Sequence, residues 1–196
     1  MKVCILGSGR GSNCQAILEA SINQQLGLAK IVGIFSDVQE SGILQVAESY
    51  GIENHFLEPG SLKAKIDKKN EAMWIKSLRG HNPDLIVLAG FMRIVSSSLI
   101  RAFDGRIINI HPSILPSFKG LHAIQQAWDH KVKISGCTVH WVSEGIDSGQ
   151  IIAQAPVRIM NGDSLSKLTQ KIQAAEHMLL PWVISDLSTG AIPFIQ

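Results

Sequence analysis

Short runs of β-branched and apolar residues alternate with longer amphipathic segments in the first half of the chain. The runs 2–6 and 30–35 are followed by segments 12–26 and 41–51, in which apolar residues recur at helical spacing. Strands that alternate with helices form parallel βαβ units, because each crossover returns the chain to the same end of the sheet. The pattern therefore predicts an α/β fold with an open, mostly parallel, Rossmann-like sheet flanked by helices.

The remaining elements extend this sheet and change its character in the C-terminal half. A helical pattern runs from about Ser61 to Gly80, and a long helix is expected from near Ser164. Further strands are expected at 55–57, 85–90, 106–111, 137–142 and 150–159. Only a loop separates the last two strands, so we expect them to pair antiparallel.

The 196 residues correspond to one compact domain, because the chain lies near the usual size of a single domain. A hydrophobic content of 45% with 17% charged residues supplies enough side chains for a sizeable core. The chain contains no repeat and no flexible linker. We therefore expect one domain, 1–196, whose N-terminal lobe (about 1–100) and C-terminal lobe (about 101–196) share one sheet.

Composition and charge exclude several classes of protein. A formal net charge of +2 gives no broad basic surface for nucleic acid. The longest apolar stretch, 85–92, is far shorter than the ~20 residues of a membrane span, and the N-terminus lacks a signal-peptide pattern. Cys4, Cys14 and Cys137 have neither disulfide-framework nor metal-ligand spacing. We expect a cytoplasmic protein without a metal, acting as a monomer or homodimer.

A glycine-rich turn, GSGRGSN at residues 7–13, joins the first strand to the first helix. Backbone N–H groups at such a turn bind phosphate, and Gly11, Ser12 and Asn13 lie at the start of the helix. The turn lacks the lysine of a P-loop, and Ser12 occupies the position of the third glycine in a dinucleotide fingerprint. The turn therefore favours a phosphate monoester. Asp37 is expected to be a helix cap or solvated loop residue, with a ribose contact as the alternative.

Asn109 and His111 lie two residues apart in the strand expected at 106–111. Because successive side chains of a strand point to opposite faces, these two polar side chains share one face. The carboxyl end of a parallel strand is where open α/β sheets place their sites. A functional pair and a structural, hydrogen-bonded histidine are both consistent with this pattern.

Asp147 lies in the loop between the two C-terminal strands, flanked by Gly145 and Gly149. If this loop brings Asp147 to His111, the chain has a set of groups suited to acyl transfer. An amide and an imidazolium stabilise a tetrahedral oxyanion, and a carboxylate orients the imidazole and takes a proton. Cys4 and Cys14 are expected to be buried apolar residues, so we assign no covalent nucleophile.

Several segments, taken together and in order, resemble one family over nearly the whole chain. They are GSGRGSNCQAI, AGFMRI, INIHPSILPSFKGLHAIQQA, GCTVHWVSEGIDSGQII and the AEH of the last helix. The chain is similar to the folate-dependent formyltransferases, and within them to the glycinamide ribonucleotide formyltransferases. The resemblance implies transfer of a formyl group from 10-formyltetrahydrofolate to the amine of glycinamide ribonucleotide, a step of purine synthesis.

The resemblance also implies roles for individual residues. Asn109, His111 and Asp147 would be catalytic. Substrate binding would fall to Gly11, Ser12, Asn13 and Glu176, with Gln173 one turn away on the same helix. The folate co-substrate would lie along Met92, Arg93, Ile94, Val95, Val142, Ser143, Glu144, Gly145 and Ile146. Lys119 and Ile124 depart from the family pattern, which affects contacts at the rim of the site.

Three alternative functions remain open at this point. A formyltetrahydrofolate hydrolase shares the catalytic trio, but usually has an added N-terminal domain and a residue other than Pro112 after the histidine. A methionyl-tRNA formyltransferase would need a further C-terminal domain and a basic surface. A non-catalytic Rossmann-type nucleotide-binding module would keep the glycine turn, but has no need of Asn109 beside His111.

Overall fold

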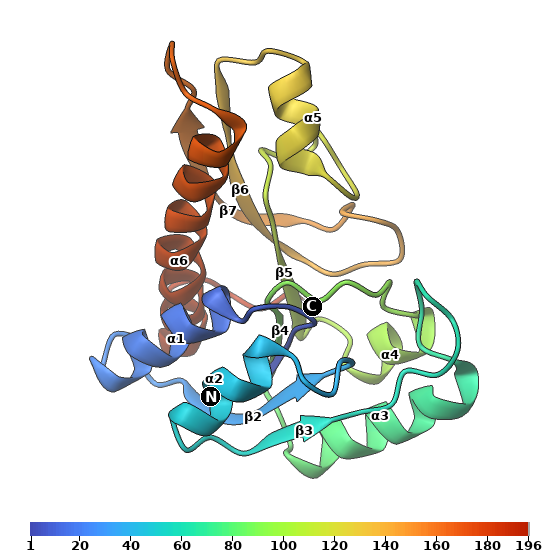
Figure 1. Cartoon of the computed structure of the whole chain (residues 1–196). Coiled ribbons are helices and arrows are strands. Elements are labelled where there is room, and N and C mark those ends of the chain that lie inside the picture. The colour runs from blue at the N-terminus through green and yellow to red at the C-terminus, as the bar shows by residue number, and fades with distance from the viewer. Residues whose placement is uncertain (196) are drawn as a thin grey trace.

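The computed structural model describes residues 1–195 and contains one seven-stranded sheet with the strand order β3-β2-β1-β4-β5-β6-β7 (Figure 1). The strands are β1 (Lys2–Leu6), β2 (Lys30–Ser36), β3 (Asn54–Phe56), β4 (Leu85–Leu88), β5 (Ile107–His111), β6 (Ile134–Trp141) and β7 (Ile151–Arg158). The helices are α1 (Ser12–Ile22), α2 (Gly42–Ser49), α3 (Lys68–Gly80), α4 (Ser97–Ala102), α5 (Ala123–Asp129) and α6 (Leu165–Thr189).

The direction of the strands changes once along the sheet. Strands β1 to β5 pair parallel with their neighbours, whereas β5 pairs antiparallel with β6, and β6 antiparallel with β7. The predicted fold class is therefore confirmed, including the antiparallel pair in the C-terminal half. Strand β5 is the only described strand with one parallel and one antiparallel neighbour.

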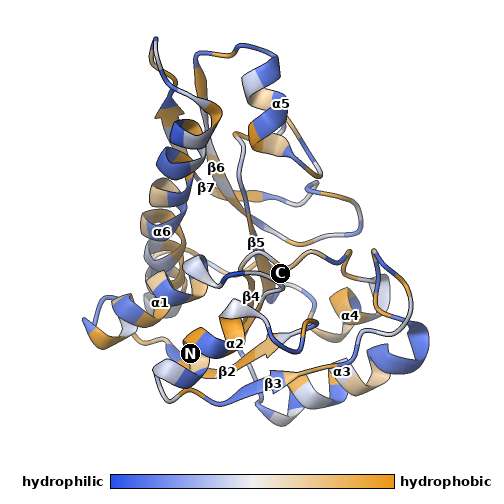
Figure 2. Cartoon of the chain, viewed as in Figure 1, coloured by the Kyte–Doolittle hydropathy of each residue, from blue (hydrophilic) through white to orange (hydrophobic). Residues whose placement is uncertain are grey.

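Both faces of the sheet are covered in its parallel part. In β1, Val3 and Ile5 face one core and Cys4 and Leu6 face the other, as the two-residue period of a strand requires. Helices α1, α2 and α6 complete the first core, and α3 and α4 complete the second. Figure 2 shows apolar strands lying between helices with hydrophilic outer sides.

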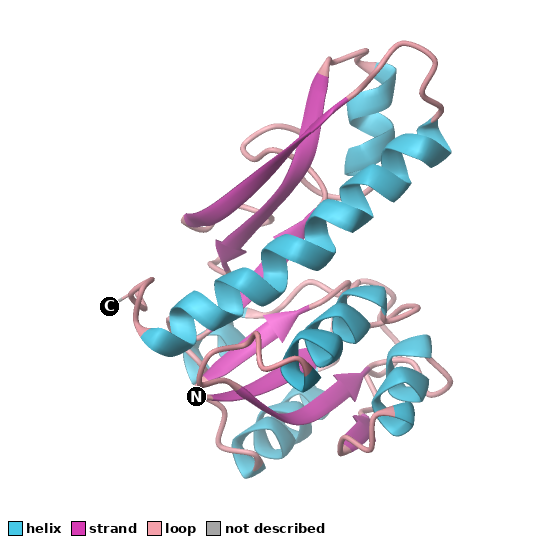
Figure 3. Ribbon diagram, turned by 90° about the vertical axis from the view of Figure 1, so that its left-hand side faces the viewer, coloured by secondary structure: helices cyan, strands magenta, loops and turns pink. Residues whose placement is uncertain are grey.

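Helix α6 is the longest element and extends alongside both halves of the sheet (Figure 3). The Ser164 hydroxyl accepts a hydrogen bond from the Lys167 N–H at 3.2 Å and caps the helix, as its sequence predicts. Its buried stripe, which includes Leu168 and Ile172, packs against α1, β6 and β7. Among the described residues no helix, α6 included, is long and apolar enough to cross a membrane.

The helix expected from about Ser61 begins instead at Lys68. The preceding residues form a loop, because side chains compete with the helix for their backbone groups. The Asp67 carboxylate accepts hydrogen bonds from the N–H groups of Ser61 and Leu62 at 2.9 and 3.3 Å. Arg93, which lies far away in the sequence, donates to the Leu62 carbonyl. Local periodicity contains no information about this distant arginine.

Other element boundaries also differ from the expectations. The first helix ends at Ile22 rather than near residue 26, because Gln24 adopts a left-handed conformation with φ of 57°. Strand β6 begins at Ile134, three residues before the expected start at 137, since the strand pairs with β7 from Ile134 onward. Helices α4 and α5, of 6 and 7 residues, were not expected, because such short segments carry little periodic signal.

All three cysteines are buried and free. Burial raises the pKa of Cys4, Cys14 and Cys137 to about 12 in each case. These thiols remain protonated at neutral pH and pack as small apolar side chains, as expected for Cys4 and Cys14.

We predict that Ile172→Ala lowers the free energy of unfolding by about 2–5 kcal/mol, because it removes a fully buried side chain from the α6 stripe. Urea denaturation monitored by circular dichroism measures the effect. Met178→Ala on the same helix is the matched control, since Met178 is 76% exposed and its change should stay within about 0.5 kcal/mol. Equal losses in both variants would contradict this assignment of the core face.

Candidate active site

Asn109 and His111 are positioned by the strand at which the sheet changes direction. Asn109 lies opposite Leu88 of β4 and opposite His140 of β6, and His111 lies opposite Thr138 of β6. The neighbouring Ile108 and Ile110 point into the hydrophobic core, which holds the two polar side chains on the other face of β5. The strand thus presents an amide and an imidazole together at its carboxyl end.

The His111 ring is buried and has an oxygen atom near each nitrogen. Its Nε2 donates to the Phe118 carbonyl at 2.8 Å, because a carbonyl can only accept. Its Nδ1 lies 3.3 Å from Oδ2 of Asp147. Each ring nitrogen of His111 therefore has an oxygen partner, and these two contacts fix the orientation of the ring. The structure brings together His111 and Asp147, which are 36 positions apart in the sequence.

Asp147 is held in place by the loop that follows β5. Its Oδ2 accepts a hydrogen bond from the Gly120 N–H at 2.8 Å. Burial acts to raise the pKa of Asp147, but hydrogen bonding, including that from the Gly120 N–H, and the nearby His111 outweigh it. The pKa of Asp147 therefore lies below its ordinary value, and the side chain is an ionised carboxylate at neutral pH.

His140 is a fourth member of this cluster that the sequence analysis did not select. Its Nδ1 donates to the Trp141 carbonyl at 2.9 Å, which leaves Nε2 of the neutral ring as an acceptor. The Asn109 Nδ2 amide donates to this Nε2 at 3.2 Å and is thereby oriented, with a second N–H left over. Oδ1 of Asp147 lies 3.7 Å from the same Nε2, which is too far for a hydrogen bond. The available signal was a histidine within the strand expected at 137–142.

A buried polar network fixes the loop that supplies the Phe118 carbonyl and the Gly120 N–H. The Thr138 hydroxyl donates to the Ser113 carbonyl at 2.7 Å and accepts from the Leu115 N–H at 3.1 Å. Gln154 of β7 donates to the Leu115 carbonyl at 2.9 Å. Side chains of β6 and β7 therefore anchor the segment that follows β5, and this segment in turn orients His111 and Asp147.

The glycine turn forms the N-terminus of α1. Gly11 is the N-cap residue, with φ of 82°, and a Cβ at this position would lie 2.7 Å from the Ile43 Cα. A residue other than glycine would therefore be strained here and would collide with α2. Within residues 1–195 no side chain caps this helix. Its first N–H groups thus lack an acceptor within the helix, which is the arrangement that binds anions.

Glu176 of α6 contacts the same end of α1. Its Oε2 accepts a hydrogen bond from Asn13 Nδ2 at 3.1 Å, and the residue is only 7% exposed. Burial raises the pKa of Glu176 to about 7, although the bond from Asn13 acts to lower it. The Asn13 Oδ1 is buried without a partner among the described residues. This pair thus has spare capacity for a polar ligand.

Arg10 is a second residue that the sequence analysis did not select. It lines a cavity of about 460 Å³ between the glycine turn and α6, together with Gln173 and Gln170. A guanidinium beside free helix amides favours an anionic ligand. Its position inside the glycine motif was the signal that could have identified it.

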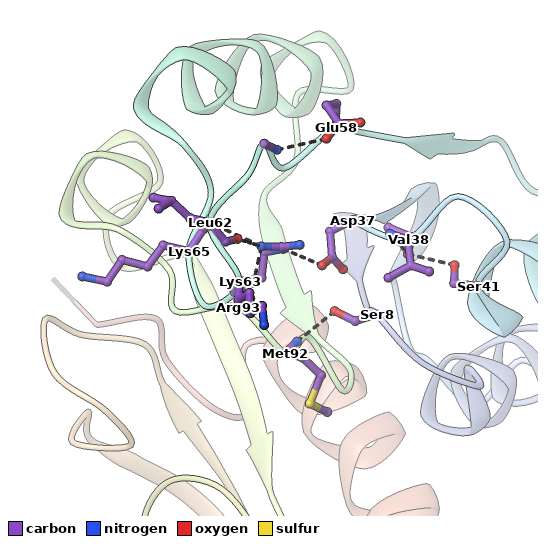
Figure 4. Close-up of polar contacts among 12 residues, drawn as sticks. Ser8, Asp37, Val38, Ser41, Glu58, Leu62, Lys63, Lys65, Met92 and Arg93 are labelled. Carbon is purple, nitrogen blue, oxygen red and sulfur yellow. Dashed lines mark hydrogen bonds and ion pairs between the residues drawn. The ribbon is translucent and has the colours of Figure 1, made fainter.

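The segment 92–95 meets the glycine turn through its backbone and fixes Arg93 away from solvent (Figure 4). The Met92 N–H donates to the Ser8 hydroxyl at 2.9 Å. The Arg93 guanidinium forms an ion pair with Asp37 at 2.6 Å and donates to the Lys65 carbonyl at 3.1 Å. Asp37 is therefore neither the helix cap nor the solvated residue that we expected, because its side chain is buried against Arg93.

The segment 142–146 begins on the sheet and then leaves it. The Val142 N–H donates to the Ile107 carbonyl at 2.9 Å, so this residue continues the pairing of β6 with β5. Glu144 forms an exposed ion pair with Arg101 of α4 at 3.3 Å. Ile146, next to Asp147, is 57% exposed. The loop therefore offers free apolar surface beside the carboxylate.

The cluster has the groups that transfer of an acyl group requires. Asn109 has a free amide N–H, the His111 ring is oriented by its contact with Asp147, and Asp147 is an ionised carboxylate. Such groups stabilise a tetrahedral oxyanion and accept a proton. The helix N-terminus at Gly11 adds an anion-binding site.

Comparisons with known proteins agree with this chemistry. The family model described as formyl transferase matches residues 1–184. A phosphoribosylglycinamide formyltransferase from Bacillus subtilis is 39% identical over 186 residues, which cover 95% of this chain and 94% of that protein. A trifunctional purine biosynthetic protein adenosine-3 from Bos taurus is 38% identical over 97% of this chain, but the chain spans only 19% of its length.

A solved structure gives the same result in three dimensions. Glycinamide ribonucleotide transformylase 1 from Symbiobacterium toebii superposes with a TM-score of 0.92 at 35% identity, covering 100% of this chain and 91% of that one. Sequence and fold thus agree over essentially the whole length. The chain belongs to the formyl transferase family.

Proposed function

We propose that the protein transfers the formyl group of 10-formyltetrahydrofolate to the amine of glycinamide ribonucleotide, giving formylglycinamide ribonucleotide and tetrahydrofolate. The observation that carries this proposal is the convergence of Asn109, His111 and Asp147 at the carboxyl end of β5. Family membership and the names of the relatives support the choice of donor and acceptor.

In the proposed mechanism the substrate amine attacks the formyl carbon directly. The new C–N bond forms as the formyl oxygen becomes an oxyanion. This oxyanion accepts a hydrogen bond from the free amide N–H of Asn109 and is also stabilised by the positive charge of His111. Asp147 takes the proton released by the amine, directly or through water. Collapse of the intermediate breaks the bond from the formyl carbon to the folate nitrogen, and that nitrogen receives the proton that Asp147 took, so the carboxylate is restored. Orientation of the two substrates supplies much of the rate enhancement.

The two substrates are assigned to two sides of this cluster. We place the phosphate of the ribonucleotide on the first amides of α1, at Gly11, Ser12 and Asn13, and its other polar groups near Gln173 and Glu176. The folate is placed along 92–95 and 142–146, where Met92 and Ile146 are 63% and 57% exposed. Neither assignment uses a metal ion. The Arg93 side chain would act by shaping this segment, since it is already paired with Asp37.

We assign the reaction to the cytoplasm, with small molecules as its partners. The three buried free thiols suit a reducing compartment. The small net charge of +2 agrees with metabolite substrates rather than nucleic acid.

Asn109→Ala is expected to lower turnover by about 10²-fold or more, with a smaller change in the KM values, because one oxyanion donor is lost. The measurement is the release of tetrahydrofolate from 10-formyltetrahydrofolate, with and without glycinamide ribonucleotide. Near-normal turnover in the variant would contradict the assigned role. In the wild type, folate release without the ribonucleotide would instead indicate a hydrolase, and no reaction in either case would indicate a binding module.

Ser12→Asp is expected to raise the KM for the ribonucleotide at least ~10-fold, since it puts a negative charge where the phosphate would bind. An acidic residue at a helix N-terminus stabilises the helix, so impaired folding would not explain the effect. Ser12→Ala is the control and should raise KM much less. An unchanged KM in Ser12→Asp would contradict the assignment of phosphate binding to this turn.

Glu176 is expected to make stability depend on pH. Its pKa is about 7 in the folded protein against an ordinary 4.5, so the unfolded chain releases this proton first as pH rises. Its contribution to stability is therefore fully present below pH 4.5 and is lost as pH rises to 7, a change of about 3 kcal/mol. Glu176→Gln should abolish this component of the pH profile of urea denaturation, whereas exposed Glu48→Gln should not. Parallel pH profiles for wild type and Glu176→Gln would contradict this contribution of Glu176 to stability.

A further inference from the structure

A second cluster of ligating side chains lies at the β3 edge of the sheet, away from the candidate active site on β5. Glu53 Oε1 lies 2.9 Å from Nε2 of His55 and 3.2 Å from Nε2 of His81. One ligand atom from each residue lies within 4.8 Å of the other two. Within residues 1–195 this is the one trio of histidine, cysteine or carboxylate side chains gathered so closely. The reaction proposed above uses none of the three.

The hydrogen bonds of His81 determine which ring nitrogen is free. Its Nδ1 donates to the Ser77 carbonyl at 3.0 Å, because a carbonyl can only accept. In the neutral ring, Nε2 then carries a lone pair that faces the Glu53 carboxylate at 3.2 Å. A positive charge between these two atoms, either a proton on Nε2 or a metal ion, turns their repulsion into attraction. A backbone carbonyl that orients the second ring nitrogen is also the usual support of a metal-binding histidine.

The two rings are held in place by aromatic packing. Phe35 of β2 stacks on His55, with ring centroids 5.2 Å apart, and meets the edge of His81 at 5.1 Å. A Cβ at Gly33 would lie 3.0 Å from Cδ2 of His81, so only glycine leaves ordinary room for this ring. The ligand atoms are therefore preorganised before any ion binds.

The local field also favours a cation. His81 is the C-cap residue of α3, and the C-terminus of a 13-residue helix carries the negative end of its dipole. Glu53 adds a negative charge and is 62% exposed, so water can reach the remaining coordination positions.

We propose that Glu53, His55 and His81 bind one divalent transition metal ion of the Zn²⁺ class, with water completing the coordination shell. Bond lengths of about 2.0–2.2 Å correspond to ligand separations of roughly 3.3 Å in a tetrahedral site. The observed 2.9 and 3.2 Å lie within a few tenths of an ångström of this value. Two imidazoles and one carboxylate favour Zn²⁺ and its neighbours over Mg²⁺ or Ca²⁺, which prefer oxygen ligands.

The proposed ion would act on the fold rather than on the reaction. It would tie the three-residue edge strand β3, which contains His55, to the end of α3, which contains His81. Strands β2, β1 and β4 separate β3 from β5, which corresponds to roughly 19 Å at the usual spacing of strands. We therefore expect the ion to stabilise the protein and to leave turnover unchanged.

The test uses the full chain after treatment with EDTA and exchange into chelator-free buffer. Titration with Co²⁺ should give visible absorption of a tetrahedral nitrogen and oxygen site that saturates at one equivalent and disappears on addition of Zn²⁺. Zn²⁺ should also raise the melting temperature by several degrees. Isothermal titration calorimetry measures its affinity and stoichiometry.

Single substitutions of the ligands identify the site. Glu53→Gln, His55→Asn and His81→Gln should each weaken Zn²⁺ binding at least ~10-fold and remove the thermal shift. Glu53 is exposed, so its variant tests the proposal even if a histidine variant fails to fold. His130→Gln is the matched control, because it removes a histidine outside the cluster and should retain full binding.

Two results would overturn the proposal. One is the absence of Zn²⁺ and Co²⁺ binding at micromolar concentrations in the wild type, which would leave the cluster as a hydrogen-bonded pair of histidines on Glu53. The other is a first equivalent of Zn²⁺ that binds equally well to all three variants, which would place the ion elsewhere, for example on His111 and His140.

Discussion

The antiparallel pairing of β6 with β5 determines how Asn109, His111, His140 and Asp147 come together in the candidate active site. A parallel neighbour would have required a crossover helix beside β5, and His140 could not have lain opposite Asn109. The antiparallel register instead places the end of β6 beside the start of β5, where the Val142 N–H donates to the Ile107 carbonyl. The loop that follows β6 then brings Asp147 back to His111. Thr138, on the same strand as His140, also anchors the segment after β5. One change of strand direction therefore gathers side chains from three separate parts of the sequence.

The fold was predictable where the pattern of residues is local. Apolar runs and helical spacing placed the strands and the long helix α6, because these elements bury residues that recur with their own period. Segment 61–67 was misassigned to a helix, since its loop depends on Asp67 and on Arg93 from beyond α3. Such long-range competition for backbone groups leaves no trace in a window of neighbouring residues.

The candidate site likewise contains residues that a local sequence pattern identifies and residues that it does not. Asn109 and His111 were selected because the strand period puts them on one face, and Asp147 because its loop could reach them. The Phe118 carbonyl could not be selected, since a backbone group has no sequence signature. His140 and Arg10 were missed for a different reason, because a single polar residue in a strand or a turn has many structural explanations. The resemblance to formyltransferases supplied roles that residue patterns alone left open.

Helix α6 has a consequence for how substrates reach the site. Its 25 residues form a rod of roughly 37 Å that packs against α1 on one side of the sheet's change of direction and against β6 and β7 on the other. Rotation of β6 and β7 against the parallel part of the sheet would have to break this helix or separate its apolar stripe from the residues against which it packs. The continuous helix therefore opposes a hinge motion between these two parts of the sheet. This favours local movements of the surface loops for the entry of ligands and the release of products.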